Sequence, residues 1–175
     1  MFDKQKINFR KISSSDLKIL FKWLNSKHVH EFYDADKENT FEDIKKRYLP
    51  KIRGEKSTDC YLVEYDGNSV GYIQKYFVND WPEFGNYLDY DDRVVSVDLF
   101  IGEQNFMGIG FGSFMLFEFI NQIVFKISGV SLCIIGPEPN NKRAIRAYQK
   151  VGFKHVKTLR IGDEKEDTYI MELSK

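Results

Sequence analysis

The sequence predicts a mixed α/β protein of the α+β type. Segments of strand length alternate along the chain with longer segments of helical periodicity. The C-terminal half has the order strand, helix, strand, helix, strand, and the N-terminal half adds a hairpin and two helices. A chain of 175 residues, 42% of them apolar, fits one domain over residues 1–175 that buries a core of its own.

In the N-terminal half, Ile7–Ile12 has the composition of a first strand. Ser13-Ser14-Ser15-Asp16 supplies N-cap candidates for a helix that follows it. A second helix is expected to begin at Thr40, where Thr40-Phe41-Glu42-Asp43 is close to a capping box. Pro50 is expected to lie beyond the last turn of that helix.

The middle of the chain predicts a hairpin. Cys60–Tyr65 and Ser69–Val78 are joined by Asp66-Gly67-Asn68, which is a strong turn signal. Residues 79–93 predict a long loop, and Val94–Ile101 predicts a strand.

The remaining elements are expected in the following order: a glycine-punctuated segment over Gly102–Ser113, a largely buried helix over Phe114–Ile127, a strand over Val130–Ile135, an amphipathic helix over Asn141–Val151, and two facing strands near Phe153–Ile161 and Asp167–Leu173.

Composition excludes several classes of protein. The 26 basic residues balance the 26 acidic ones, so no basic stripe for nucleic acid is expected. Cys60 and Cys133 are too few for a disulfide framework or a zinc site, and His28 and His30 project to opposite sides of one element, so no metal is expected. The first residues show no secretory signal and no apolar stretch is long enough to span a bilayer, which predicts a cytoplasmic protein without a membrane partner.

A glycine loop follows the predicted strand Val94–Ile101. Gly108-Ile109-Gly110-Phe111-Gly112-Ser113 leaves backbone N–H groups bare at the start of a helix, where the helix dipole favours an anion. The spacing does not match a dinucleotide fingerprint, because Ser113 and Met115 stand where that motif needs glycine. It does not match a Walker loop either, because no Gly-Lys-Ser/Thr follows. The loop predicts a pyrophosphate site, and Ser113 is expected to cap the helix or contact the anion; the alternative is a turn that only changes direction.

The downstream helix carries a second motif. Asn141, Ala144, Tyr148, Gly152 and Phe153 have the spacing Asn-x-x-Ala-x-x-x-Tyr-x-x-x-Gly-Phe. Together with the glycine loop this resembles the GCN5-related N-acetyltransferase (GNAT) superfamily. The resemblance implies a central, mostly antiparallel sheet that splays around acetyl-CoA, with helices on both faces. It also implies that Asn141 contacts the pantetheine arm and that Tyr148 protonates the departing thiolate.

The acetyl-CoA site implied by this resemblance comprises Phe100, Ile101, Gly108, Gly110, Phe111, Gly112, Ser113, Asn141, Ala144 and Tyr148. One position departs from the superfamily pattern. An Arg or Gln usually stands three residues before the Gly-x-Gly, whereas Asn105 or Met107 stands there in this sequence.

The N-terminal half narrows the resemblance to the aminoglycoside 6′-N-acetyltransferases. The matching segments are Trp23-Leu24-Asn25, Glu31-Phe32-Tyr33, Tyr48-Leu49-Pro50, Gly71-Tyr72-Ile73-Gln74, Val97-Asp98, Phe100-Ile101-Gly102-Glu103 and Tyr169-Ile170-Met171-Glu172. The implied substrate is a small polycation, bound by Tyr33, Gln74, Asp98 and Glu138, in a monomer or homodimer. Gly136 stands where the family carries an Asp that binds a substrate amine, so Glu138 or an acidic loop is expected to take that role.

Asp98 is a candidate catalytic residue even without the resemblance. A carboxylate inside so apolar a strand is costly unless a cation or hydrogen bonds satisfy it. A substrate ammonium would supply the cation, and the carboxylate could then orient the amine and accept its proton. The alternative is an acid satisfied by a neighbouring Arg or by backbone amides.

The segment Asn79–Asp98 predicts a local negative field. Six acids lie there against one base, Arg93, with Trp81, Phe84, Tyr87 and Tyr90 between them. Such a field would attract a small polycation, and the alternative is a solvated acidic loop. Two other functions stay open from the sequence: an acetyltransferase for another amine, such as a polyamine, a hydroxamate precursor or a protein terminus, and a non-catalytic CoA-binding domain.

Overall fold

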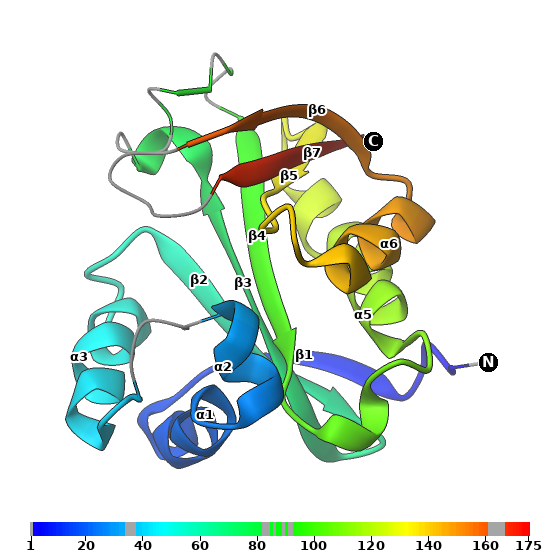
Figure 1. Ribbon diagram of the computed structural model, residues 1–175. Coiled ribbons are helices and arrows are strands. Elements are labelled where there is room, and N and C mark those ends of the chain that lie inside the picture. The colour runs from blue at the N-terminus through cyan, green and yellow to red at the C-terminus, as the bar shows by residue number, and fades with distance from the viewer. Residues whose placement is uncertain are drawn as a thin grey trace. The chain divides into compact units, whose positions relative to one another are not determined.

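The computed structural model describes residues 2–33, 38–81, 85, 87–88, 90, 93–160 and 167–175. The strands are β1 (Ile7–Lys11), β2 (Thr58–Tyr65), β3 (Asn68–Phe77), β4 (Val94–Ile101), β5 (Leu132–Ile135), β6 (Lys154–Leu159) and β7 (Thr168–Ser174). The helices are α1 (Leu17–Leu24), α2 (Lys27–Tyr33), α3 (Phe41–Ile52), α5 (Phe111–Gln122) and α6 (Lys142–Val151), as labelled in Figure 1.

The strands form one sheet with the order β1-β2-β3-β4-β5-β7-β6. The pairs β1–β2, β5–β7 and β6–β7 are antiparallel, and β4–β5 is parallel. The predicted fold class, a mixed α/β protein with a mostly antiparallel sheet, is therefore confirmed.

The chain divides into two compact units, and neither is continuous in sequence. The N-terminal unit comprises residues 1–74 and 99–112, and the C-terminal unit comprises residues 75–98 and 113–175. Strands β3 and β4 and helix α5 each pass from one unit to the other. That residues 1–175 form one domain stays a prediction.

The N-terminal unit has a core of aliphatic and aromatic side chains. Helix α1 packs against both α2 and α3, and Figure 1 shows these three helices side by side. The fully buried members of the core include Leu20, Trp23, Leu24, Ile44, Tyr48, Leu62 and Tyr72.

Local signals in this unit behave as predicted. Thr40 caps α3: its hydroxyl accepts the Asp43 N–H at 3.2 Å, and the Asp43 carboxylate accepts the Thr40 N–H at 3.0 Å. The hairpin turn between β2 and β3 contains Asp66 at φ 51° and Gly67 at φ 77°, the left-handed pair that tight hairpins need.

One helix of this unit was not predicted, and one prediction is wrong. Helix α2 was not predicted, because Val29 is its only buried side chain and so no apolar stripe marks it. Pro50 lies inside α3 rather than beyond it. It costs the helix one hydrogen bond near its end, and burial of Ile44 and Tyr48 on the preceding turns holds the helix to Ile52.

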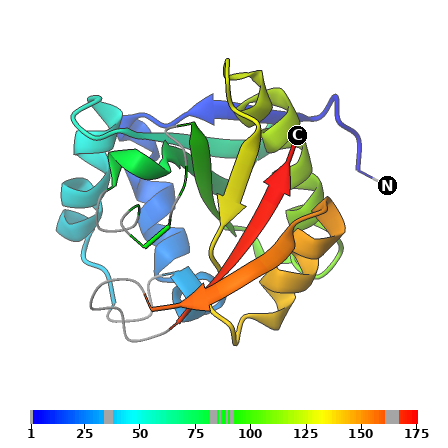
Figure 2. The ribbon, with the colours of Figure 1, turned by 90° about the horizontal axis from the view of Figure 1, so that it is seen from above.

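In the C-terminal unit, β7 lies between β5 and β6, as Figure 2 shows from above. The facing terminal strands are as predicted, with a bulge between His155 and Lys157. Strand β5 begins at Leu132 rather than Val130, because the Val130 N–H closes a turn on the Ile127 carbonyl at 3.2 Å.

Helix α6 agrees closely with its prediction. Asn141 is the N-cap, and its side-chain oxygen accepts the Ala144 N–H at 3.1 Å. Gly152 ends the helix at φ 112°, a left-handed conformation that suits glycine.

The boundaries of α5 differ from the predicted Phe114–Ile127. The helix begins three residues earlier, at Phe111, and ends at Gln122, and a separate short turn covers Val124–Lys126. The early start has a tertiary cause. The Phe111 ring is fully buried and lies 5.1 Å from the ring of Phe2, 5.5 Å from that of Tyr65 and 4.7 Å from that of Phe106.

No helix within the described residues is both long and apolar enough to cross a membrane.

A close approach of backbone to side chain occurs at Gly102, just after β4. A Cβ at this position would stand 2.2 Å and 2.3 Å from atoms of the Trp23 indole, whose side chain is fully buried. Only glycine therefore lets the end of β4 pack on the indole face.

We expect Gly102→Ala to lower the free energy of unfolding by about 1–3 kcal/mol, because the added methyl group overpacks the indole. Denaturant unfolding followed by circular dichroism measures the change. Gly112→Ala is the matched control, since its Cβ would meet only the Ile101 Cδ1 at 3.4 Å, and alanine favours a helix over glycine by about 1 kcal/mol. Equal effects of the two substitutions would contradict the packing argument.

Candidate active site

The glycine loop begins after β4 in the N-terminal unit, and its last residues, 111–113, form the first turn of α5. Gly108 and Gly110 have φ angles of 76° and 90°, and a Cβ at either position would meet nothing within 4 Å. The two glycines are therefore required by backbone conformation, and the space beside them is open. This open cradle at a helix start fits an anionic group such as a pyrophosphate.

The register of the loop differs from the predicted one at Ser113. Because α5 begins at Phe111, Ser113 lies within the first helical turn and is not the cap residue. The first-turn N–H groups of Phe111, Gly112 and Ser113 carry the positive end of the helix dipole. The prediction of Ser113 as a helix cap is wrong, whereas its contact with an anion stays a prediction.

Two predicted cofactor residues have side chains that belong to the core. The Phe100 ring is buried and stacks on the Tyr72 ring at 5.2 Å, and the Phe111 ring is buried among the aromatic residues described above. Any contact of Phe100 or Phe111 with a cofactor therefore involves backbone atoms. Ile101 is half-buried, and its Cδ1 approaches the Gly112 backbone.

Two predicted substrate residues, Tyr33 and Gln74, lie in the N-terminal unit. The Tyr33 ring packs edge-on against the ring of Phe100 at 4.8 Å. The Gln74 side chain is 9% exposed, and its oxygen accepts the Tyr72 hydroxyl at 2.8 Å and the Lys51 ammonium at 3.0 Å. The ammonium also lies 5.4 Å from the centre of the Tyr48 ring.

Sequence reasoning missed this polar cluster of Lys51, Cys60, Tyr72 and Gln74. The Tyr72 hydroxyl lies 2.9 Å from the Cys60 sulfur, and burial raises the pKa of both groups. A glutamine inside an apolar strand was the available signal, because a buried amide needs hydrogen-bond partners as much as Asp98 does.

The two predicted catalytic residues lie in the C-terminal unit and interact electrostatically. Asp98 is half-buried near the end of β4, two residues beyond the last described β4–β5 pair at Ser96. Tyr148 on α6 is 9% exposed. Burial, and next the negative charge of Asp98, raise the pKa of the Tyr148 hydroxyl well above its usual range. At neutral pH Tyr148 is therefore a neutral hydrogen-bond donor close to a carboxylate.

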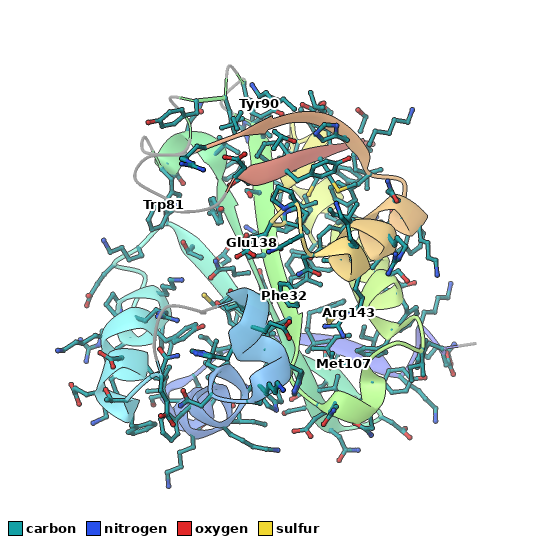
Figure 3. All side chains as sticks on the ribbon, viewed as in Figure 1. Phe32, Trp81, Tyr90, Met107, Glu138 and Arg143 are labelled. Carbon is teal, nitrogen blue, oxygen red and sulfur yellow. The ribbon has the colours of Figure 1, made fainter. Side chains whose placement is uncertain are left out.

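The segment between β5 and α6 carries Glu138, which is labelled in Figure 3. Glu138 is half-buried, and its carbonyl oxygen accepts the Asn141 N–H at 3.0 Å. Asn141 and the half-buried Ala144 open α6, where the Asn141 side-chain oxygen serves the cap. A contact of Asn141 with a pantetheine arm would involve its amide NH₂ group.

The structure explains why a glycine stands at residue 136. A Cβ at this position would stand 2.6 Å from the Cγ2 of Thr168 on β7. The Tyr169 N–H also donates to the Pro137 carbonyl at 2.8 Å, which ties β7 to the same turn. The space that a side chain at residue 136 would occupy is therefore filled by Thr168.

Four of the six acids of the predicted acidic segment lie outside the described residues, namely Glu83, Asp89, Asp91 and Asp92, and so does Phe84. Of the described part, Tyr90 donates its hydroxyl to the Glu172 carboxylate, and the Trp81 ring lies 5.9 Å from that of Tyr76. Figure 3 labels Trp81 and Tyr90. Among the described residues, no group of three or more His, Cys, Asp and Glu side chains is arranged to hold a metal ion.

Comparison with known families decides the assignment of the fold. A family model described as an acetyltransferase (GNAT) domain matches residues 13–161. The chain belongs to the GNAT acetyltransferase family. The predicted family is thereby confirmed, and with it the prediction of an N-acetyltransferase that uses acetyl-CoA.

Individual GNAT relatives extend over nearly the whole chain. Aminoglycoside N(6′)-acetyltransferases type 1 of Klebsiella pneumoniae and Serratia marcescens are each 28% identical over 90% of this chain and 78% of their own length. A structure of AAC(6′)-Ib with paromomycin and acetyl-CoA has a TM-score of 0.88 at 25% identity, covering 97% of this chain and 94% of that one. AAC(6′)-Ib with coenzyme A and kanamycin has a TM-score of 0.86 at 25% identity, covering 97% of this chain and 95% of that one.

We expect Gly136→Ala to reduce the free energy of unfolding by about 1–3 kcal/mol, because its methyl group overlaps the Thr168 Cγ2. Thr168→Ser removes that methyl group and keeps the hydroxyl, so Gly136→Ala should cost less than about half as much in the Thr168→Ser background. A double-mutant cycle measured by denaturant unfolding tests this coupling. Additive effects of the two substitutions would show that Thr168 does not fill the space beside Gly136.

Proposed function

We propose that this protein is an aminoglycoside 6′-N-acetyltransferase, which transfers an acetyl group from acetyl-CoA to a primary amine of an aminoglycoside antibiotic. The observation that carries the proposal is the similarity to aminoglycoside N(6′)-acetyltransferases over 90% of the chain. Acetylation replaces an ammonium by a neutral amide and removes a charge with which the drug holds ribosomal RNA. Resistance to the antibiotic is the expected consequence.

On the amine side, the proposed catalytic residue is Asp98. Its carboxylate, on the largely apolar strand β4, attracts and orients the substrate ammonium. It then accepts a proton, directly or through a water molecule, and leaves the neutral amine as the nucleophile. Loss of this proton is required, because an ammonium has no lone pair to attack a carbonyl carbon.

On the sulfur side, the proposed residue is Tyr148. Bound acetyl-CoA supplies an acetyl group that is already activated as a thioester. Because burial and Asp98 hold the pKa of Tyr148 high, its hydroxyl keeps its proton and donates a hydrogen bond where negative charge develops on the sulfur. The free thiol of coenzyme A has a pKa of about 8.5, below the raised pKa of Tyr148, so we propose this hydrogen bond in place of the full proton transfer that the resemblance implies.

The glycine loop is proposed to hold the pyrophosphate through the backbone N–H groups at Gly108, Gly110 and the first turn of α5. The open space beside Gly108 and Gly110 and the dipole of α5 support this role. Phe100, Ile101, Gly112, Asn141 and Ala144 stay predicted contacts of the cofactor.

The substrate is proposed to be a small polycation. Asp98 and Glu138 are half-buried carboxylates of the C-terminal unit that can pair with ammonium groups, and Tyr33 and Gln74 are proposed as further contacts. The predicted cytoplasmic location and the state of monomer or homodimer stay predictions.

Release of free thiol from acetyl-CoA tests the proposed function. Kanamycin and tobramycin are offered beside spermidine and a blank without acceptor, and NMR of the product identifies the acetylated amine. We expect turnover with the aminoglycosides at the 6′ amine. Turnover with spermidine alone would instead favour an acetyltransferase for another amine, and the replacement of an expected Asp by Gly136 is the feature that would fit that result.

Asp98→Asn is expected to lower kcat/KM for the aminoglycoside by about 10²-fold or more, because the amide cannot accept the proton. The acetyl-CoA dissociation constant, measured by calorimetry, should change little. Asp167→Asn is the matched control: it removes a carboxylate from an exposed residue of the same unit that lies outside the acidic segment, and it should leave both constants unchanged. Full activity of Asp98→Asn would show that Asp98 neither orients the amine nor accepts its proton.

Gly112→Val is expected to raise the KM for acetyl-CoA about tenfold or more, because its side chain stands in the first turn of α5, where the backbone must approach the anion. The KM for the aminoglycoside should stay within about twofold. Gly112→Ala, with a smaller side chain, should give an intermediate value. If both variants kept the original KM for acetyl-CoA, the glycine loop would not be the pyrophosphate site.

A further inference from the structure

We propose that Glu103 is a positioning residue for the glycine loop: its carboxylate ties the segment that carries this loop to Trp23 on α1. The inference rests on the proposed assignment of the loop to acetyl-CoA. It adds a residue for which neither the motifs nor the resemblance supplies a role.

The Glu103 carboxylate makes two hydrogen bonds of different kinds. One oxygen accepts the indole N–H of Trp23 at 2.8 Å and the ammonium of Lys22 at 2.8 Å. The Trp23 side chain is fully buried, so its N–H depends on Glu103 for an acceptor. The Lys22 side chain is largely exposed, so that ion pair contributes little.

The backbone groups of Gly102 and Glu103 make further hydrogen bonds. Both N–H groups donate to the Val70 carbonyl, at 2.9 Å and 3.1 Å, and the His28 ring lies 3.1 Å from the Gly102 carbonyl. Together with the packing of the indole on Gly102, these contacts fix the backbone directly after β4. We call this cluster of Trp23, His28, Gly102 and Glu103 the Trp23 clasp.

A short hydrogen-bonded segment joins the Trp23 clasp to the loop. The Phe106 N–H donates to the Glu103 carbonyl at 3.1 Å, and the Met107 N–H donates to the Gln104 carbonyl at 3.0 Å. Met107, labelled in Figure 3, directly precedes Gly108. A displacement of Glu103 is therefore passed along one hydrogen-bonded turn to the first glycine of the loop.

The other end of the loop is fixed by Phe111, whose buried ring lies against the rings of Phe2, Tyr65 and Phe106. Only Gly108, Ile109 and Gly110 separate the two anchored ends. The glycines adopt left-handed conformations that an unanchored chain would hold only part of the time. Anchoring both ends orders the loop before binding, which lowers the entropy cost of binding an anion.

Calorimetric titration with acetyl-CoA tests this role in the full-length protein. Glu103→Ala is expected to raise the dissociation constant roughly fivefold to tenfold, the scale of a loop that must be reordered on binding. Glu103→Gln should stay close to the original value, because its amide oxygen still accepts the Trp23 N–H. Lys22→Met, which removes only the exposed partner, should have no effect.

Two further readouts separate positioning from a general loss of structure. The indole N–H resonance of Trp23 should shift in Glu103→Ala and not in Lys22→Met, and the aminoglycoside KM should not change in any variant. A dissociation constant for acetyl-CoA that is unaltered in Glu103→Ala overturns the proposal. If Glu103→Ala does not fold, Glu103→Asp replaces it: the shorter carboxylate cannot reach Trp23, so an unaltered constant again overturns the proposal.

Failure of the proposed function would be recognised separately. If the unmodified protein does not bind acetyl-CoA, the assignment of the loop is wrong whatever Glu103 does. Hydrogen exchange of the backbone amides at residues 108–112 then still tests the clasp. Faster exchange in Glu103→Ala than in Lys22→Met supports positioning of the loop, and equal exchange refutes it.

Discussion

The continuity of β4 is the constraint on which the site depends. Its first four residues, Val94–Val97, are buried, which holds the strand in the sheet. Asp98 follows in the C-terminal unit, and Phe100 and Gly102 follow in the N-terminal unit. Because a strand advances by a fixed rise per residue, the position of the buried segment determines where the carboxylate and the start of the loop segment stand along β4.

Sequence reasoning succeeded where the signal is local. The Thr40 capping box, the Asp66-Gly67 turn and the ends of α6 at Asn141 and Gly152 all depend on residues within a few positions of one another. Each of these motifs satisfies backbone groups or permits a left-handed angle, and both needs are visible in the residue types.

Sequence reasoning failed where tertiary packing determines the boundaries of an element or the partners of a side chain. The start of α5 was predicted three residues late because Phe111 joins the helix only when its ring is buried by residues far away in sequence. Helix α3 continues through Pro50 to Ile52 because side chains on its earlier turns are buried. Pro50 taken alone predicts that the helix ends before it. The bonds of Lys51 to Gln74 and of Glu103 to Trp23 join residues that no pattern of spacing connects.

The candidate site shows the same division. The glycine loop and the α6 motif could be found from sequence because their spacing is a property of short segments. The effect of Asp98 on Tyr148 could not, because it requires the end of β4 and the middle of α6 to lie close together. Burial and this proximity both raise the pKa of the Tyr148 hydroxyl, which favours its neutral, hydrogen-bond-donating form.

The turn after β5 leads to a related conclusion about substrate recognition. With the Thr168 methyl group beside Gly136, a side chain cannot be placed at residue 136 without displacing that methyl group. Under the proposed function, recognition of a polycation would therefore use carboxylates at other positions, and the half-buried Asp98 and Glu138 are the ones proposed. In the proposed mechanism Asp98 both pairs with the reacting ammonium and accepts its proton, so a substrate whose reacting ammonium lay elsewhere would lose both interactions at once.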